Sequence, residues 1–359
     1  MSTGPRRTHV VVIFGGESAE HDVSCVTAAH VLRALDPARY EVTAVGITRG
    51  GEWVVARDAM HALASGPAGI PARLEAAGDT TDLAAVVAPR DDDAPVVAVP
   101  LLHGPMGEDG TVQGLLELAH VPYVGAGVLG SAIAMDKAIT KSLLARHGLP
   151  QPEHRVVRDL PGADALVHAA VRDLGVPVFV KPANMGSSVG VAKARGAEEA
   201  VEAARRAFAY DEWVLVEEAV AGREIEVAVL GNESPRASVP GEIVPSREFY
   251  DYEDKYLLDG ARLLVPAPLE AAQADEVRRL ALEVFAVVRA DGMARVDFFL
   301  EEDGRGFLVN EINTIPGFTP ISMYPKLWQA SGLTYAGLVD ELIALALERH
   351  ARRRRTTTR

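Results

Sequence analysis

Residues 294–317 read ARVDFFLEEDGRGFLVNEINTIPG, two apolar runs with regularly spaced polar residues on either side of a turn. Alternate side chains of a β-strand point to the same face, so Arg295 and Asp297 share one face while their neighbours point into the core. Glu311 and Asn313 are again two residues apart and share a face in the second run. If the runs pair through the turn EEDGRG, the hairpin presents a guanidinium, two carboxylates and a carboxamide on one side.

The residue types on this face suit a metal site that also binds nucleotide phosphates. Mg²⁺ accepts such oxygen ligands, and a carboxylate bridging two ions would neutralise phosphate charge during transfer. The alternative is the solvated polar face of an edge hairpin. Four polar residues at matched spacing, directly before the turn Thr314-Ile315-Pro316-Gly317, favour the metal site. Gly317 would also let its backbone amide approach a ligand closely.

A second motif, KPANMGSSVG at 181–190, places Lys181 at the end of an apolar strand and before a Gly- and Ser-rich loop. The amides and hydroxyls of such a loop can surround a triphosphate while the ammonium neutralises its charge. The loop is not a Walker A motif, because the order Gly-x4-Gly-Lys-Ser/Thr is absent. Taken alone it is also typical of a flexible connection, so the phosphate interpretation depends on the other motifs.

The remaining pattern predicts an α/β chain of three domains. The opening reads as a strand, a Gly-Gly turn, a helix at about 24–35 and a strand at 40–47, which is the pattern of an open α/β sheet. We expect this first domain to cover residues 1–130. A second domain with the Gly-Ser loop should cover 131–220, and a third with the hairpin should cover 221–350.

Several further elements follow from local pattern. PVVAVPLLH is expected to be a strand that leads into the Gly-rich turn HGPMGEDG at 103–110, and VPYVG is expected to be another short strand. An apolar face recurs at helical spacing over about 131–147, before a Gly-x-Pro stop, and predicts one helix. Residues 351–359, ARRRRTTTR, form a charge run that we expect to be a disordered, solvated tail.

Composition narrows the class of protein. The 359 residues carry a formal charge of -14, which disfavours binding to nucleic acid or to anionic membranes because both present phosphate. A hydrophobic fraction of 48% is enough for each domain to bury a core. Cys25 is the only cysteine, so an intrachain disulfide and thiol-rich metal sites are excluded. The first apolar run, HVVVIF, is too short for a signal segment or a membrane span, and we expect a cytoplasmic enzyme.

Six motifs together give the sequence a specific resemblance to one family. They are GGESAEHDVS at 15–24, LHGPMGEDGTVQG at 102–114, MDK at 135–137, KPANMGSSVGV at 181–191, EFYDYEDKY at 248–256, and ARVDFF with NEINTIPGFTPISMYP within 294–325. With these motifs the chain resembles the D-alanine–D-alanine ligases of the ATP-grasp superfamily, up to about His350. The resemblance implies a three-domain ATP-grasp fold whose N-terminal domain is Rossmann-like.

The resemblance also implies the reaction. The carboxylate of a first D-alanine would attack the γ-phosphate of ATP to give D-alanyl phosphate. The amine of a second D-alanine would then give D-alanyl-D-alanine, with ADP and phosphate as the other products, for peptidoglycan synthesis. The tetrahedral oxyanion needs preorganised donors, and Arg295 and Gly317 match them. Asp297, Glu311 and Asn313 would hold two Mg²⁺ or Mn²⁺ ions, and the family implies a homodimer.

ATP would lie between two antiparallel sheets. The residues implied at the nucleotide are Lys137, Lys181, Ser187 and Ser188 at the phosphates, Glu217, Glu218 and Val220 at adenine, Glu224 at the ribose, and Lys255. Without the MDK context, Lys137 would read as an exposed helix lysine.

The amino-acid substrates would be held by other motifs. Glu20 would bind the first ammonium and form a hydrogen-bonded triad with Ser187 and Tyr256, although a carboxylate there would also favour a helix N-terminus. Tyr256 belongs to an expected lid at 245–264 that closes over ATP and excludes water; alone, it would read as a packing residue. The residues implied at the second substrate are Ser322 and Lys255 at its carboxylate, Met323 as apolar surface, and His103 and Glu108 at its flank. His103 alone would read as a structural histidine.

The sequence departs from the family pattern in two places. His21-Asp22 stands where many relatives carry Arg-Glu, which puts the surroundings of Glu20 in doubt. Ala219 and Val220 occupy adenine-side positions that are often larger, which affects nucleotide packing rather than chemistry.

Other functions compete with dipeptide synthesis. A sister ligase would accept D-lactate or D-serine second, and the Tyr256 lid motif disfavours it. A non-catalytic nucleotide-binding regulatory protein would not require the complete set of metal and phosphate residues. A dehydrogenase is disfavoured because GGESAEH does not spell G-x-G-x-x-G.

Overall fold

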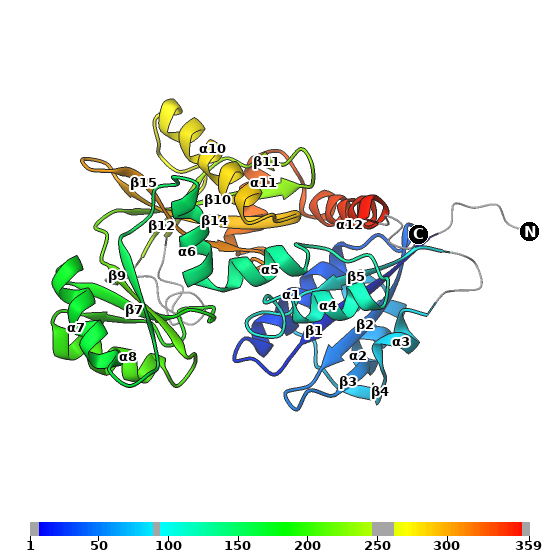
Figure 1. The fold of residues 1–359 in the computed structure, drawn as a ribbon. Helices are drawn as coiled ribbons and strands as arrows, with labels where there is room; N and C mark the ends of the chain where they lie inside the picture. Colours follow the sequence, from blue (N-terminus) through cyan, green and yellow to red (C-terminus); the bar gives the residue numbers. More distant parts are fainter. Residues whose placement is uncertain (1–6, 89–93, 246–261, 354–359) are drawn as a thin grey trace, which may run out of the picture.

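The computed structural model describes residues 7–88, 94–245 and 262–353. These residues form three sheets with helices packed against them, the mixed α/β architecture that was predicted. In Figure 1 the blue N-terminal sheet and the green sheet lie at opposite sides of the molecule, and the yellow-to-orange elements connect them. The motifs identified in the sequence lie in loops and at strand ends between these sheets.

The N-terminal sheet confirms the predicted open α/β pattern. Its strand order is β4-β3-β2-β1-β5, with β1 parallel to both β2 and β5. The strands are β1 (Thr8–Gly15), β2 (Tyr40–Ile47), β3 (Trp53–Ala56), β4 (Gly78–Thr80) and β5 (Val96–Pro100). The helices are α1 (His21–Ala34), α2 (Arg57–Ala64), α3 (Leu83–Val86) and α4 (Thr111–Leu118), with a 3-10 turn at Pro67–Gly69. Because β1 and β5 are parallel, the turns that follow them emerge at the same edge of the sheet.

The segment VPYVG differs from its prediction as a strand. Only Tyr123 forms a bridge, with Ala98 of β5. Pro122 has no N–H to continue a ladder.

The second sheet is antiparallel and carries the Gly-Ser loop. Its order is β6-β9-β7-β8, and the loop joins β7 to β8. The elements are β6 (His154–Arg158), β7 (Val178–Pro182), β8 (Ala192–Ala194), β9 (Trp213–Glu218), α7 (Ala163–Leu174) and α8 (Ala197–Ala207). The two helices lie on one side of this sheet in Figure 1, and their apolar residues share a core with Val180 and Val216.

The third sheet contains the predicted hairpin. Its order is β13-β12-β10-β14-β15, with β11 paired to β10. The elements are β10 (Arg223–Gly231), β11 (Arg236–Ala237), β12 (Gly241–Val244), β13 (Arg262–Leu264), β14 (Gly292–Glu301), β15 (Gly306–Asn313), α10 (Ala271–Val287), α11 (Met323–Ala330) and α12 (Tyr335–Arg353). Val296 and Phe298 of β14 share a core with residues of α10, so Arg295 and Asp297 face away from that helix.

The single helix predicted over 131–147 is two helices, α5 (Val128–Met135) and α6 (Lys137–Arg146). Asp136 separates them, and its carboxylate accepts a hydrogen bond from the Ile139 N–H at 2.9 Å. This N-cap explains the break, because it satisfies a backbone donor that would otherwise lack a partner at the start of α6. It also makes Lys137 the first residue of a helix.

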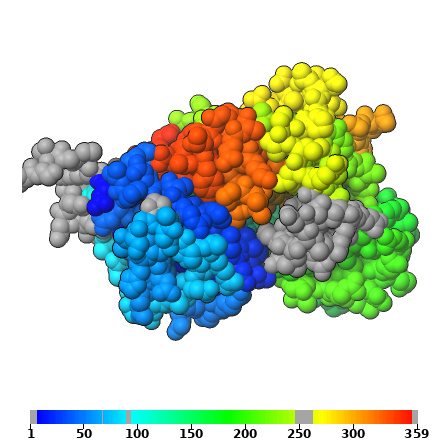
Figure 2. Space-filling view, turned by 180° about the vertical axis from the view of Figure 1, so that it is seen from behind, coloured from blue at the N-terminus to red at the C-terminus, as the bar shows by residue number. Residues whose placement is uncertain are grey.

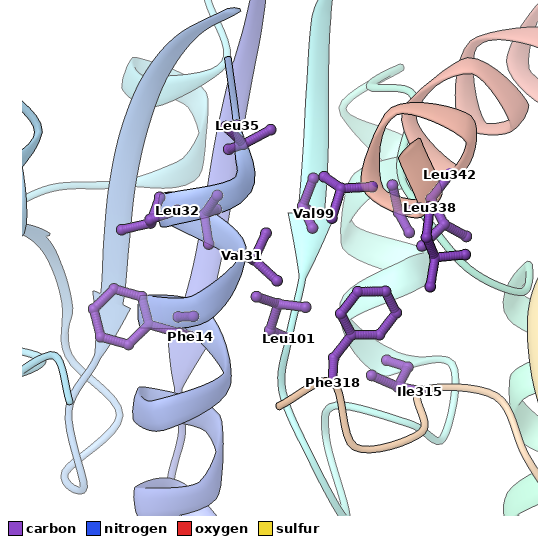
Figure 3. Close-up of a cluster of buried hydrophobic side chains, with 14 of the residues drawn as sticks. Phe14, Val31, Leu32, Leu35, Val99, Leu101, Ile315, Phe318, Leu338 and Leu342 are labelled. Atoms are coloured by element: carbon purple, nitrogen blue, oxygen red, sulfur yellow. The ribbon is translucent and has the colours of Figure 1, made fainter. Parts of the chain in front are cut away.

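One continuous core joins the N-terminal domain to the C-terminal end of the chain. Figure 3 shows Val31 and Leu101 of the first domain beside Phe318, which follows the hairpin, and Leu338 and Leu342 of α12. From behind, the orange and red residues lie directly against blue ones (Figure 2). The turn after β15 is therefore anchored on the first domain.

Residues 351–353 do not belong to the disordered tail that we expected, because α12 continues to Arg353. Arg349 is buried and donates to the carbonyls of Tyr123, at 2.8 Å, and of Gly125. Arg352 and Arg353 pair with Asp291 at 2.7 and 3.0 Å. These ion pairs explain why 351–353 are helical, while 354–359 lie outside the described residues.

Among the described helices, none is by itself long and apolar enough to cross a bilayer. Only α11 and α12 taken together pass such a test, and they are bent by 102° relative to each other.

Candidate active site

The β14–β15 hairpin presents its polar residues on one face, as predicted. Arg295 is opposite Asn313, and Asp297 is opposite Glu311. Arg295 donates to both oxygens of Asp297 at 2.7 Å, and the Asn313 amide donates to Asp297 Oδ2 at 3.1 Å. The register shifts after Asp297, because Phe298 pairs with Val309 and skips one residue of β15. This bulge puts Val309 in the core although Glu311, two residues on, lies on the polar face.

Arg295 has a second acidic partner that the sequence analysis did not identify. Its Nε lies 3.1 Å from Glu226 Oε2, and Glu226 is buried in β10. Burial alone would lower the pKa of Arg295, but the charges of Asp297 and Glu226 outweigh it and raise that pKa, so the guanidinium stays protonated. The sequence signal was present: Glu224 and Glu226 alternate within an otherwise apolar strand.

The donors on this hairpin suit a cation that has further ligands of its own. Within residues 7–88, 94–245 and 262–353, no group of three or more His, Cys, Asp or Glu side chains is arranged to hold a metal ion. Asp297, Glu311 and Asn313 nevertheless offer the two carboxylates and one carboxamide that hard cations prefer. A metal at this face would therefore complete its shell with water or with oxygens of a ligand.

Glu20 and Ser187 meet although they are 167 residues apart, and the Ser187 hydroxyl donates to Glu20 Oε1. Glu20 is buried and stands at the N-cap of α1, but its side chain makes no cap bond there. The carboxylate therefore links the first domain to the Gly-Ser loop instead of capping its own helix. Ser187 and Ser188 both have positive φ, at 48° and 60°, a backbone state that non-glycine residues rarely adopt. The third member expected in this group, Tyr256, lies outside the described residues, as does Lys255.

The Gly-rich turn after β5 reaches the same place. The Gly104 N–H donates to Glu108 Oε2 at 2.6 Å, and the Ser18 hydroxyl donates to the His103 carbonyl at 2.7 Å. Burial, reinforced by the charge of Glu20, raises the pKa of Glu108 to about 8. Burial also lowers the pKa of His103, against the opposing charge of Glu20. At neutral pH both groups are therefore mostly uncharged beside the Glu20 carboxylate.

Two predicted phosphate lysines lie near the Gly-Ser loop, since Lys181 ends the strand before it and Lys137 bonds to it. Lys137 Nζ donates to the Met185 carbonyl of the loop at 2.7 Å and lies 3.7 Å from Glu311 Oε2. A small pocket is lined by Lys137, Glu311, Asn313 and Glu108, among others. Lys181 donates to Glu217 Oε1 at 2.5 Å. The structure thus brings the MDK motif, the loop and the hairpin to one pocket.

Glu217 also contacts a lysine that the sequence analysis missed. Lys141 Nζ lies 2.7 Å from Glu217 Oε2. Burial disfavours the charged form of Glu217, but the two lysines more than offset burial and lower its pKa to about 2. Lys141 follows Lys137 by four residues, a spacing that places both on one helix face and could have signalled it.

We expect the pairing of Glu217 with the two lysines to make the free energy of unfolding depend on pH. Because the folded pKa is about 2, below the ordinary value of 4.5, this contribution is present above about pH 5 and is lost as pH falls toward 2. Glu217→Gln should lower the free energy of unfolding at pH 7 by about 3–5 kcal/mol, since it leaves buried lysines without their partner. Denaturant unfolding should be measured at pH 7, 5 and 3. The difference in the free energy of unfolding between Glu217→Gln and the wild type should become smaller as the pH falls. Glu212→Gln, in an exposed pair with Arg158, is the control and should have little effect. A difference that stays constant with pH would contradict the assignment.

The residues predicted at adenine and ribose lie along the end of β9 and the start of β10. Glu218 is held by Arg305 at 2.5 Å and accepts from the Glu153 N–H at 2.7 Å. Arg305 belongs to the β14–β15 turn, so this pair connects the second and third sheets. Val220 and Glu224 are half-buried, on the connection and on β10 respectively.

The turn after β15 brings Gly317 next to Ser322. A Cβ built on Gly317 would lie 3.0 Å from Ser322 Oγ, and Thr319 Oγ1 is 2.8 Å from the same oxygen. Met323, which we expect to offer apolar surface near the second substrate, has its side chain buried in the core. Its position at the start of α11 explains this: the first turn of the helix packs against Gly241 of β12.

Comparison with known proteins agrees with this geometry. Family models described as the N-terminus and the C-terminus of D-ala D-ala ligase match residues 9–126 and 143–344. A D-alanine–D-alanine ligase of Thermoanaerobacter sp. (strain X514) is 47% identical, over 95% of this chain and 97% of that protein. One from Solibacter usitatus is 47% identical over 98% of both chains.

Solved structures resemble the chain over nearly its whole length. The D-alanine–D-alanine ligase from Coxiella burnetii has a TM-score of 0.80 at 36% identity, covering 97% of this chain and 96% of that one. The VanG D-Ala:D-Ser ligase from Enterococcus faecalis has a TM-score of 0.81 at 32% identity, covering 95% and 100%. The chain therefore belongs to the D-alanine–D-alanine ligase family and has the ATP-grasp fold of that family.

Proposed function

We propose that this chain ligates two D-alanines at the expense of ATP, giving D-alanyl-D-alanine, ADP and phosphate, as a step in peptidoglycan precursor synthesis. The observation that carries the proposal is the hydrogen bond between Glu20 and Ser187. It joins the proposed ammonium site of the first domain to the proposed phosphate loop of the second. Relatives with the dipeptide ligase name are 44–47% identical over nearly the whole chain, which supports the same activity here.

We assign the triphosphate to the space between the Gly-Ser loop and the hairpin. Lys137 and Lys181 would neutralise its charge, while Ser187 and Ser188 and the loop amides would surround it. Glu217, Glu218 and Val220 would lie along adenine, with Glu224 at the ribose. The support is positional: Lys137 bonds the loop and lies near Glu311, so the phosphate and hairpin residues border one pocket.

We assign Asp297, Glu311 and Asn313 to Mg²⁺ or Mn²⁺, with two ions by similarity to the family. When bound, the ions would neutralise charge on the transferred phosphoryl group. The residues themselves fix oxygen ligands on a rigid hairpin, and Arg295 and the Asn313 amide hold Asp297 in place through hydrogen bonds.

In the proposed reaction, an oxygen of the first D-alanine carboxylate bonds to the γ-phosphorus as the bond to the β-phosphate oxygen breaks. Glu20 would hold the ammonium of this substrate and so orient its carboxylate. The amine of the second D-alanine then attacks the acyl carbon, and phosphate leaves. Among the described residues, Arg295 bonds through Nε and Nη2, so we assign its Nη1, with the Gly317 N–H, to the oxyanion.

The identity of the second substrate, and the residues that bind it, form a more detailed part of the proposal. Ser322 and Lys255 would receive its carboxylate, and His103 and Glu108 would flank it. Met323 can contribute through its backbone at the start of α11, since its side chain is in the core. The TM-scores for a D-Ala–D-Ala ligase and a D-Ala:D-Ser ligase are 0.80 and 0.81, so the fold does not distinguish these substrates.

Phosphate release tests the activity. We expect release from ATP with D-alanine alone, and mass spectrometry of a mixed pool of D-amino acids should identify D-alanyl-D-alanine as the main product. Release only when D-lactate or D-serine is added would favour a sister ligase. Nucleotide-dependent thermal stabilisation without turnover under any D-amino acid would favour a regulatory protein.

Tyr256 should control rejection of D-lactate if it closes the lid over the site. We expect Tyr256→Phe to raise the ratio of depsipeptide to dipeptide product, because it would remove the hydroxyl that we propose to bond the Ser187–Glu20 pair. Tyr252→Phe, in the same motif, is the matched control. Unchanged selectivity in the Tyr256 variant would contradict this role.

We further propose that the chain is a cytoplasmic homodimer. Exposed apolar side chains on α4 and α5, among them Leu115, Leu118 and Leu129, offer surface for a second copy. Light scattering should then give twice the chain mass of 38.2 kDa, and a monomer at micromolar concentration would contradict it. A reducing compartment suits a chain whose single cysteine is buried, and cell fractionation tests the location.

A further inference from the structure

Lys141 lies on α6 one helical turn after Lys137, and only 1% of its surface is exposed. Residues four apart share a helix face, so α6 directs both ammonium groups to the same region. Lys137 reaches the carbonyl of Met185 in the Gly-Ser loop, whereas Lys141 reaches Glu217. Lys141 therefore lies behind the residues that we assign to ATP, with almost no surface for a ligand.

Glu217 divides its carboxylate between two lysines. Oε1 accepts from Lys181 at 2.5 Å, and Oε2 lies 2.7 Å from Lys141. Lys141, Glu217 and Lys181 form a row of charged side chains. The exposed fraction increases along this row, from 1% at Lys141 to 2% at Glu217 and 8% at Lys181. Lys181 is thus the end of the row that a ligand can reach.

The packing of α6 does not require a charge at this position. Ala138 and Leu144, which are also buried on α6, are apolar, and Ala138 forms a small apolar cluster with Ala183 and Leu215. Burying an ammonium is costly, and apolar replacements of buried ion pairs are often neutral or stabilising. Stability alone therefore does not account for a lysine here.

The charge of Lys141 changes the net charge that a ligand encounters near Lys181. Without Lys141, Glu217 and Lys181 would form a one-to-one pair with no net charge. Burial lowers the pKa of Lys141, and the charge of the Glu217 carboxylate opposes that effect. With Lys141 protonated, the row carries one net positive charge, and one oxygen of Glu217 faces Lys141 instead of Lys181. In a site of low dielectric constant this difference acts strongly on a bound polyanion.

We propose that Lys141 is a positioning residue for the nucleotide: it holds Glu217, so that the Lys181 ammonium stays directed to the phosphates and its charge is not cancelled. This role rests on the proposed ATP-dependent activity, and it predicts an effect on ATP rather than on D-alanine.

The first test compares Lys141→Met, which keeps most of the side-chain length without its charge, with Lys141→Arg. We expect the methionine variant to raise the KM for ATP, and the Kd for ATP measured by calorimetry without D-alanine, by roughly tenfold or more. The KM for D-alanine and kcat should stay within about threefold. The arginine variant should recover most of the ATP affinity, because it restores the cation.

Leu144→Ala is the matched control on the same helix. It should lower the thermal midpoint by loss of packing while leaving the Kd for ATP unchanged. An ATP affinity that falls equally in the Leu144 and Lys141→Met variants would overturn the proposal, because it would show a purely structural effect. Equal increases in the KM for ATP and for D-alanine would also overturn it.

A double-mutant cycle tests whether Lys141 acts through Glu217. In a Glu217→Gln background, Lys141→Met should have little further effect on the Kd for ATP, since the carboxylate it acts on is gone. Additive effects would contradict the proposed route. If the wild-type protein released no phosphate with D-alanine, the proposed function would be wrong. If the wild type were active and Lys141→Met had unaltered ATP affinity, only the proposed role of Lys141 would be wrong.

Discussion

Replacement of Glu311 by Gln is expected to abolish ligation while leaving the fold nearly intact. Glu311 lies opposite Asp297 on the polar face of the hairpin and 3.7 Å from Lys137. Gln keeps the shape of the side chain but removes the charge that we assign to the metal ions. Metal coordination at a transferred phosphoryl group contributes several kcal/mol, so we expect kcat to fall by about 10³-fold or more.

The Glu311 variant should unfold almost as wild type does. Its side chain is 26% exposed, and its pair with Lys137 resembles surface pairs that contribute about 0–1 kcal/mol. Phosphate release and thermal melting of the same samples make the comparison. Glu302→Gln, in an exposed pair with Arg223 at the tip of the hairpin, should change neither quantity. Wild-type turnover in Glu311→Gln would refute the metal assignment.

Two substitutions of Arg295 should separate its effect on the free energy of unfolding from its effect on turnover. Arg295→Ala leaves Asp297 and Glu226 without their buried partner, so we expect a loss of about 3–5 kcal/mol in the free energy of unfolding together with loss of activity. Arg295→Lys keeps the charge but not the planar fork that bonds both oxygens of Asp297. We therefore expect the lysine variant to remain folded.

Turnover of the lysine variant is the sharper measurement. Removal of one oxyanion donor typically lowers kcat by about 10²–10³-fold, and we expect a loss of that size in Arg295→Lys at saturating substrates. The KM values should change much less, because the interaction is assigned to the intermediate. A wild-type kcat in Arg295→Lys would show that the guanidinium does not act on the oxyanion.

The polar face of the hairpin could be predicted because strand alternation has a period of two and each pair of residues lies within one strand. The bulge after Asp297 could not, since alternation alone does not locate the residue that is skipped. The break between α5 and α6 was also missed. The apolar periodicity continues across it, and only the cap formed by Asp136 interrupts the helix.

Pairings between distant segments were harder to predict than local ones. The spacing of Glu226 and Lys141 within their strand and helix marks them as candidates, but it does not identify their partners. Their partners come from strands that are distant in sequence, so the pairs exist only once the sheets are assembled. The Glu20–Ser187 contact, by contrast, was expected from family resemblance, not from any spacing in the chain.

The arginines at the end of α12 bear on the order in which the protein can fold. Arg349 bonds the carbonyls of Tyr123 and Gly125 from more than 220 residues away, and the core of the first domain includes Phe318 and Leu342. Contacts so far apart in sequence close late, after the intervening chain has been synthesised and ordered. Cutting the chain after residue 130 would uncover Val31, Leu101 and Val124 where α12 now packs. We therefore expect the N-terminal sheet and its helices to complete their folding only when the last helix of the chain packs against them.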